Sequence, residues 1–303
     1  MQLSHHSDYV VPLPDGHPFP MGKYGLLRQI LLERLVVSEQ DFVVSEPIDI
    51  ELLRSVHTDE YLAKLVHSTL TAAEQRRIGV PWSPALWRRS LLAVQGTLNA
   101  ARNALRTGLS GNLAGGTHHA FADRGEGFCV LNDVAVTIRA LQRERVCERA
   151  LIIDLDVHQG NGTAAIFEND PDVYTFSVHG ERNYPSDKMR STRDVGLPDG
   201  TTDADYLQAL QQHLPAVLAA SRADIVFYLA GVDVAAGDRY GRFALSDDGI
   251  RAREQFVLQA VRERQMPLAI TLAGGYAPTP LRTAELHAIV FEEAARMERT
   301  TTQ

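Results

Sequence analysis

The segment ALIIDLDVHQGNGT, residues 150–163, decides the fold of this sequence. Its first residues, 150–153, are apolar without alternation, which is typical of a parallel strand that is covered on both faces. Asp154, Asp156 and His158 follow at alternate positions, and in an extended chain such side chains project to the same side. The segment therefore predicts a buried strand whose carboxyl end presents two carboxylates and an imidazole together.

These three polar side chains have two interpretations. At the end of a buried strand they would be costly to remove from water unless a cation lay among them, and a divalent metal ion is the obvious candidate. Gly160 and Gly162 follow and permit the sharp turn by which a strand leaves into a loop. The alternative is that an Asp at a strand end only caps a turn, and that the nearby His only forms a hydrogen bond. The other strand ends bear on this choice.

Composition excludes several classes of function. The chain has 303 residues, of which 45% are hydrophobic and 22% are charged, so it can bury a large core. Its net charge of −8 gives no basic footprint for nucleic acid, although a local acidic site could still bind a cationic substrate. Cys129 and Cys147 form neither a disulfide framework nor a zinc-ribbon spacing. No apolar run approaches the ~18 residues of a membrane span, and residues 1–16 lack the layout of a signal peptide, so we expect a cytoplasmic protein.

Strands and helices are predicted to alternate along the chain. Residues 1–21 are expected to form a loop or short strand, and the predicted strands cover 41–45, 112–116, 150–153, 173–178, 224–230 and 267–273. Helices are predicted from about residue 23 and over 49–56, 60–70, 84–106, 132–144, 163–168, 203–220, 246–264 and 281–299. Residues 71–84 and 180–202 are expected to be irregular. Without a repeat or linker, this order predicts one α/β domain over residues 1–303, a parallel sheet with helices on both faces.

Four of the strands end in unusual polar sequences. Open α/β sheets place their ligands just beyond the carboxyl ends of the strands, where such ends meet. The sequences in question are GGTHHA (115–120), DLDVHQGNG (154–162), GVDVAAGD (231–238) and GGY (274–276). We therefore expect them to form one site.

His118 and His119 are adjacent, so an extended chain would point them apart, whereas a turn after the two preceding glycines could bring both into one cavity. Two imidazoles near a bound metal would suit general acid–base chemistry near neutral pH. A His pair is not by itself a functional signal, since His5 and His6 form a second pair without any supporting context.

The last two strand ends add three candidate residues. Asp238 could complete an Asp-His-Asp set with Asp156 and His158, and three protein ligands with one open position are usual in catalytic zinc sites. Asp233 is interpreted as a structural loop residue. Tyr276 either anchors its glycine-rich loop or donates its hydroxyl hydrogen to a polarised carbonyl.

The combined motifs resemble the zinc-dependent histone deacetylase family and its bacterial relatives. The resemblance rests on GGTHHA, GEGFCVLND, IDLDVHQGNGT, AGVDVAAGDRYG and GGY in this order, together with HPFPMGKY and VHTDEYL, and it spans nearly the whole chain. HQGNGT and DVGLPDGTTDADYL are most similar to the class IV branch and to bacterial proteins near it. The resemblance implies the arginase–deacetylase fold, a single α/β domain on an eight-stranded parallel sheet with helices on both faces.

The resemblance also implies roles for individual residues. Asp156, His158 and Asp238 would bind Zn²⁺, and Asp154 would orient His118. The tandem catalytic histidines would be His118 and His119, Tyr276 would polarise the carbonyl, Gly127 and Phe128 would wall the acyl-lysine channel, and Tyr184 is a candidate rim aromatic. A structural K⁺ would be bound by Asp154, Asp156, His158, Ser177 and Val178.

Two positions depart from the family pattern. Asn161 stands where class I members have an Asp behind the second histidine, and a neutral partner stabilises an imidazolium less than a carboxylate does. His119 is therefore the better candidate for a base that is neutral at rest. Ala273 stands where many members have another glycine before the tyrosine, so closure of that loop is in question.

The implied function is zinc-dependent amide hydrolysis, which removes an acetyl or longer acyl group from acyl-lysine, an acylated polyamine or a related small amide. One alternative is a binuclear-manganese ureohydrolase on the same fold, which would need a bridging carboxylate where this chain has Gly160. The other is a non-catalytic protein that binds an acylated ligand. The sequence predicts no nucleic-acid or membrane partner and assigns no oligomeric state.

Overall fold

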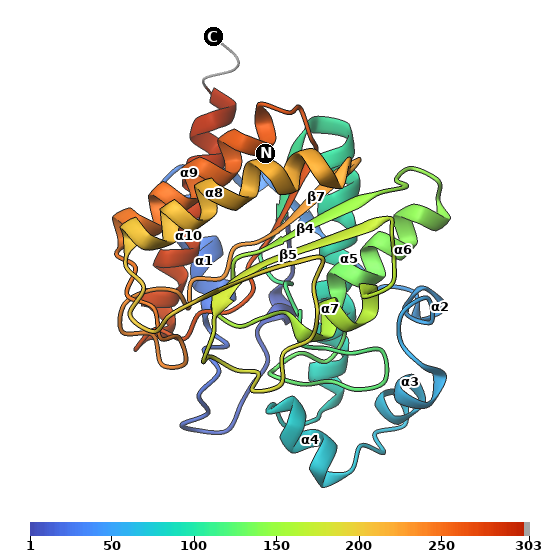
Figure 1. Cartoon of the computed structure of the whole chain (residues 1–303). Coiled ribbons are helices and arrows are strands. Elements are labelled where there is room, and N and C mark those ends of the chain that lie inside the picture. Colours follow the sequence, from blue (N-terminus) through green and yellow to red (C-terminus); the bar gives the residue numbers. More distant parts are fainter. Residues whose placement is uncertain (300–303) are drawn as a thin grey trace.

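The sheet is entirely parallel, and its strand order is β2-β1-β3-β8-β7-β4-β5-β6. The computed structural model describes residues 1–299 (Figure 1). The strands are β1 (Gln2–His5), β2 (Phe42–Val44), β3 (Leu109–Asn112), β4 (Ala150–Asp154), β5 (Val173–Gly180), β6 (Arg193–Leu197), β7 (Ile225–Leu229) and β8 (Leu268–Thr271). This eight-stranded parallel sheet confirms the predicted fold class.

Helices cover both faces of the sheet, as an all-parallel sheet requires. Their bounds are α1 (Lys23–Glu33), α2 (Ile50–Leu53), α3 (Asp59–Val66), α4 (Ala72–Ile78), α5 (Pro84–Thr107), α6 (Asp133–Arg143), α7 (Asn161–Phe167), α8 (Asp203–Ser221), α9 (Asp247–Arg262) and α10 (Pro280–Arg299). Figure 1 shows α1, α8, α9 and α10 on one side of the sheet and α5, α6 and α7 on the other. No helix within residues 1–299 is long and apolar enough to cross a bilayer.

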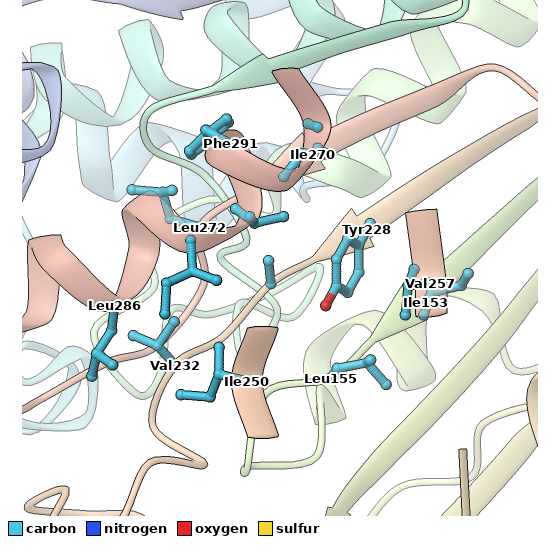
Figure 2. Close-up of a cluster of buried hydrophobic side chains, with 14 of the residues drawn as sticks. Ile153, Leu155, Tyr228, Val232, Ile250, Val257, Ile270, Leu272, Leu286 and Phe291 are labelled. Carbon is cyan, nitrogen blue, oxygen red and sulfur yellow. The ribbon is translucent and has the colours of Figure 1, made fainter. Parts of the chain in front are cut away.

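The central strand β4 explains why its apolar residues do not alternate with polar ones. Ile153 packs in the core beneath α8, α9 and α10, together with Tyr228 of β7 and Ile270 of β8 (Figure 2). Its neighbour Ile152 packs in the opposite core, beneath α5 and α6. Both side chains are at most 1% exposed, so each face of β4 contributes hydrophobic free energy. The strand therefore places Asp154 at the carboxyl end of the most protected part of the sheet.

Three local predictions were wrong. Residues 71–84 include α4, whose first turn is closed by a capping box between Thr71 and Glu74. Residues 180–202 include β6, an exposed edge strand whose polar residues gave no strand signal. The predicted strand over 112–116 instead ends at Asn112, because Gly115 and Gly116 adopt positive φ and turn the chain. The single domain predicted over 1–303 includes residues 300–303, which lie outside the described part of the chain.

Candidate active site

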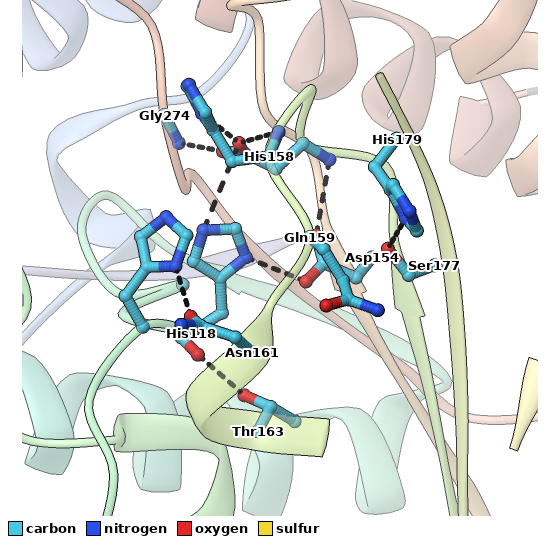
Figure 3. Close-up of polar contacts among 12 residues, drawn as sticks. His118, Asp154, His158, Gln159, Asn161, Thr163, Ser177, His179 and Gly274 are labelled. Carbon is cyan, nitrogen blue, oxygen red and sulfur yellow. Dashed lines mark hydrogen bonds and ion pairs between the residues drawn. The ribbon is translucent and has the colours of Figure 1, made fainter. Parts of the chain in front are cut away.

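The site begins where β4 ends. Backbone amides of the following loop fold back onto its carboxylates: the N–H of Asp156 donates to Asp154 Oδ1 at 3.2 Å, and that of His158 donates to Asp156 Oδ1 at 2.9 Å. The second oxygen of Asp156 accepts from Gly274 N at 2.6 Å, in the loop after β8 (Figure 3). These bonds hold two buried carboxylates beside the imidazole and leave further lone pairs for a cation.

Asp156, His158 and Asp233 form a cluster that could hold a metal ion, with one donor atom from each lying within 4.8 Å of the others. His158 Nδ1 lies 2.9 Å from Asp156 Oδ1 and 3.1 Å from Asp233 Oδ2. Val157 N also donates to Asp233 Oδ1 at 2.9 Å, so Asp233 has the structural bond that was expected of it as well as a place in the cluster. Two carboxylates and an imidazole are a donor set that suits Zn²⁺.

Asp238 lies outside that cluster of described residues, although the sequence predicts it as a ligand. One of its oxygens accepts from Tyr240 N at 2.9 Å and Gly241 N at 3.0 Å, and the other accepts from Tyr276 N at 2.7 Å. The Asp238 carboxylate thus ties the loop after β7 to the loop that carries Tyr276. The ligand trio of Asp156, His158 and Asp238 stays a prediction.

His118 and His119 do enter one cavity, and their ring centroids are 4.1 Å apart. Their Nδ1 atoms have chemically different partners: Asp154 Oδ2 lies 2.7 Å from that of His118, and Asn161 Oδ1 lies 2.6 Å from that of His119 (Figure 3). A primary amide oxygen can only accept, so His119 Nδ1 carries the proton and His119 Nε2 has a free lone pair.

The electrostatic environment separates the two histidines further. Burial lowers the pKa of His118, but the carboxylates of Asp154 and Asp156 outweigh it and raise that pKa to about 9. Burial, followed by the neighbouring His118 and His158, holds the pKa of His119 well below its usual value. Adjacent groups whose pKa values are pushed apart are typical of an acid–base pair.

A tight turn at residues 126–129 supplies the wall beside His119. Gly127 and Phe128 both have positive φ, of 54° and 67°, and the backbones of Glu126 and Cys129 are hydrogen-bonded to each other. A Cβ on Gly127 would lie only 2.5 Å from His119 Cδ2, so the imidazole packs directly on the glycine backbone. The structure therefore gives a physical reason for glycine at the predicted channel wall.

The cavity has a volume of about 30 Å³. Its lining comes from three of the four unusual strand ends, from the N-terminal segment, from α5 and from the turn at 126–129: Phe19, Tyr24, Arg89, Gly115, Gly116, Thr117, His118, His119, Gly127, Phe128, Cys129, Asp156, His158, Ala273, Gly274 and Tyr276. Tyr184 lies beside this lining, with its ring edge-on to His119 at 5.0 Å and its hydroxyl bonded to Glu126. Three strand ends thus meet at the cavity, and the fourth reaches them through Asp233, which lies beside His158, and Asp238, which accepts from Tyr276 N.

Comparison with known proteins agrees with this arrangement. The family model for the histone deacetylase domain matches residues 17–290. The chain belongs to the histone deacetylase family. Histone deacetylase 2 of Arabidopsis thaliana is 34% identical over 279 residues, which cover 88% of this chain and 71% of that protein. A protein of Picosynechococcus sp. described as uncharacterized is 47% identical over 273 residues, which cover 90% of this chain and 91% of its own.

Solved structures of histone deacetylase relatives share the fold. An HDAC homolog complexed with SAHA aligns with a TM-score of 0.82 at 25% identity, covering 97% of this chain and 84% of its own. The HDA15 HD domain aligns with a TM-score of 0.79 at 23% identity, covering 97% and 87%. The chain is accordingly a histone deacetylase-like hydrolase that acts on amide bonds.

Asp133 was missed from the sequence, and it holds the histidine loop of this deacetylase in place. Its fully buried carboxylate accepts from Gly116 N at 3.0 Å, from the amide and hydroxyl of Thr117 at 2.8 and 2.6 Å, and from the Thr97 hydroxyl at 2.6 Å. Asp133 is the last residue of the motif GEGFCVLND, which was the one signal in the sequence that could have pointed to it. Its partners come from segments that only the tertiary structure brings together.

Lys23 was missed as well, and it supports the tyrosine loop. Its buried ammonium donates to the Ala273 carbonyl at 3.1 Å and lies 3.3 Å from His287 Nε2. Ala273 has φ of 57°, a left-handed conformation that normally favours glycine. Closure of the loop is thus compatible with alanine at this position.

Three of the five predicted potassium ligands lie on the neighbouring strands β4 and β5, and Asp156 and His158 lie in the loop after β4. Asp154 at the end of β4 is in register with Ser177 of β5, and Val178 is the next residue of that strand. The Ser177 hydroxyl lies 2.9 Å from His179 Nδ1 (Figure 3). Assignment of K⁺ to Asp154, Asp156, His158, Ser177 and Val178 stays a prediction.

Proposed function

We propose that this histone deacetylase family member is a zinc-dependent deacylase that hydrolyses the amide of acyl-lysine or of a related acylated amine. The observation that carries the proposal is the pair of adjacent histidines with unlike partners, one on a carboxylate and one on an amide, beside a buried acidic cluster. Such a pair can supply a base and an acid to the same reaction.

The proposed zinc ligands are Asp156, His158 and Asp238. Asp238 is favoured by the motif match, by its partly exposed carboxylate and by its bond to the backbone of Tyr276 at the cavity. Bound zinc would polarise the acyl carbonyl and lower the pKa of water. Metal content decides the third ligand: we expect Asp238→Asn protein to lose zinc, whereas Asp233→Asn protein would lose it if Asp233 were the ligand. Mass spectrometry of each variant, after equilibration with zinc, measures the number of zinc ions bound per chain.

The chain's own residues have distinct proposed roles. His119 Nε2, which has the free lone pair, takes a proton from the attacking water. Tyr276 donates a hydrogen bond to the developing oxyanion. His118, next to the Asp154 carboxylate, protonates the leaving amine. The two histidine roles depend on the hydrogen-bond partners behind the imidazoles, Asp154 for His118 and Asn161 for His119.

A direct test uses purified, zinc-loaded protein and an acetyl-lysine reporter. His119→Ala should abolish turnover while leaving the zinc content unchanged. His67→Ala, at an exposed histidine on the surface after α3, is the matched control and should keep wild-type turnover. Undiminished activity of the His119→Ala protein would rule out the proposed base.

The binuclear-manganese alternative is disfavoured by the surroundings of Gly160. A Cβ there would collide with the Asp154 carboxylate and lie 3.1 Å from His118 Nδ1 and Cβ, so a bridging carboxylate at residue 160 would not fit this backbone. Two Mn²⁺ ions per chain in metal analysis would reverse this preference.

The non-catalytic alternative predicts binding of an acylated ligand without turnover. Since one solved relative is a complex with SAHA, binding of SAHA without turnover would favour it.

The activity for which the relatives are named favours a short acyl group. Histone deacetylase 2 of Arabidopsis thaliana is named for removal of an acetyl group. A panel of lysine peptides with acyl chains of increasing length, with acetylpolyamines alongside, should give the highest kcat/KM for the acetyl group. A maximum at a long acyl chain would contradict this preference.

A further inference from the structure

Asn161 connects the catalytic histidine to a carboxylate at the cavity rim. Its amide oxygen lies 2.6 Å from His119 Nδ1, and its amide nitrogen donates to Glu126 Oε1 at 3.0 Å. An amide has one accepting and one donating end, and which end faces which neighbour determines the proton position on the imidazole. If the amide were turned over, its NH₂ group would face His119 and favour the proton on Nε2, which would remove the proposed base.

Glu126 is itself held firmly. It occupies the first position of the tight turn at 126–129, where its backbone is bonded to Cys129. The Tyr184 hydroxyl also donates to Oε1, and Arg124 Nε lies 3.6 Å from Oε2. A carboxylate has no hydrogen to donate, so Glu126 offers Asn161 only acceptor atoms, and its other side-chain partners, Tyr184 and Arg124, are donors as well.

We propose that Glu126 is a positioning residue that fixes the amide orientation of Asn161 and thereby the Nδ1-protonated tautomer of His119. The inference rests on the proposed role of His119 as the base. In this arrangement the negative charge of Glu126 is separated from the His119 imidazole by the neutral Asn161 amide, whereas a carboxylate at position 161 would contact the imidazole directly. Glu126 therefore sets the orientation of the amide, and the amide sets which imidazole nitrogen carries the proton.

An exchange of the two functional groups tests the proposal. In Glu126→Gln protein, the new amide can present its NH₂ group to Asn161, which turns the Asn161 amide over in most molecules, so kcat should fall about tenfold with little change in KM. Adding Asn161→Asp restores an acceptor that faces His119 whichever way it turns, while the new amide at position 126 can donate to it. The double variant should therefore recover kcat to within about threefold of wild type. Recovery is incomplete because residues 126 and 161 are in contact and their effects are not additive.

The matched control is Asp123→Asn. Asp123 is an exposed carboxylate in the same loop that pairs with Arg124 and not with Asn161, so this variant should keep wild-type kcat. The proposal is overturned if Glu126→Gln leaves kcat unchanged, or if the double variant is no more active than Glu126→Gln. Circular dichroism establishes that each variant is folded.

The tautomer can also be measured without turnover or substitution. Nitrogen-15 NMR of histidine-labelled wild-type protein should show His119 protonated on Nδ1, and Glu126→Gln protein should show both tautomers. A wild-type His119 protonated on Nε2 would overturn the proposal even if no variant folded. If the wild-type protein failed to hydrolyse any acyl-lysine reporter, the proposed function would fail, while the NMR result would still decide the assignment of Glu126.

Discussion

The floor of the active site, residues 154–158 with Asp233, is buried, whereas the rim, residues 124–128 with Tyr184, is in part open to solvent. Floor carboxylates accept backbone N–H groups from several loops, as Asp156 does from His158 and Gly274. Rim contacts are made by side chains that reach across from exposed turns, as Tyr184 does to Glu126. The comparison shows that the sheet fixes the positions of the buried carboxylates and His158, whereas exposed loops supply the side chains around the cavity entrance.

The largest effect is expected from adding one methyl group at Gly160, directly beside the floor carboxylate of Asp154. Gly160→Ala would push a Cβ into Asp154 and His118, and should lower kcat/KM by at least about 100-fold because overpacking displaces groups whose positions the reaction requires. Steady-state kinetics on the reporter measure this. Gly25→Ala is the control: it lies in α1 with its nearest neighbour atom 3.7 Å away, and should stabilise the protein by about 0.5–1 kcal/mol without loss of activity. Equal activity of the Gly160→Ala and Gly25→Ala proteins would mean that close packing beside the floor is not required for catalysis.

Asp133 extends the contrast to the layer that supports the histidines. Asp133→Asn replaces one accepting oxygen by an NH₂ group, which would then face the N–H and O–H donors that this oxygen now binds. The change should lower the free energy of unfolding by about 2–3 kcal/mol. Urea denaturation measures the change. Asp172→Asn, at an exposed carboxylate, should change it by less than about 0.5 kcal/mol. A small effect at both positions would mean that the Asp133 bonds contribute little to stability.

His57 tests whether a buried histidine outside the active site makes stability depend on pH. Its Nε2 accepts from Asn132 N at 3.0 Å, and burial lowers its pKa from 6.5 to about 4. The unfolded chain therefore binds a proton below pH 6.5 that the folded protein does not bind until about pH 4, so stability falls through this window and is unaffected above it. His57→Gln should reduce the loss between pH 7 and pH 4 by about 3 kcal/mol. Parallel slopes for the two proteins in urea denaturation would contradict this.

The smallest effect is expected at the rim. Tyr184→Phe removes the hydrogen bond to Glu126 but keeps the ring against His119, so kcat/KM should fall only about two- to fivefold. The same reporter assay measures it. A loss as large as that of Gly160→Ala would place Tyr184 with the floor and not with the rim.

The sequence predicted the parts of the molecule that depend on neighbouring residues. The apolar run of β4 is visible because both faces are buried, and the alternate spacing of Asp154, Asp156 and His158 follows from strand geometry. Helix α4 was missed although Thr71 and Glu74 carry its capping signal, and β6 was missed because an exposed edge strand needs no apolar pattern. The fold class was predicted correctly because neither element changes how the sheet is layered.

What the sequence alone determined is the alternation of strands and helices, the strand ends that converge, and the chemical types gathered there, since all of these follow from the periodicity and order of residues along the chain. Only the tertiary structure decided that Asp233 lies within the acidic cluster, that Asp133 holds the histidine loop and that Glu126 faces Asn161. These contacts join residues far apart in the sequence. Their partners depend on distances of a few ångströms between loops, which no local pattern encodes.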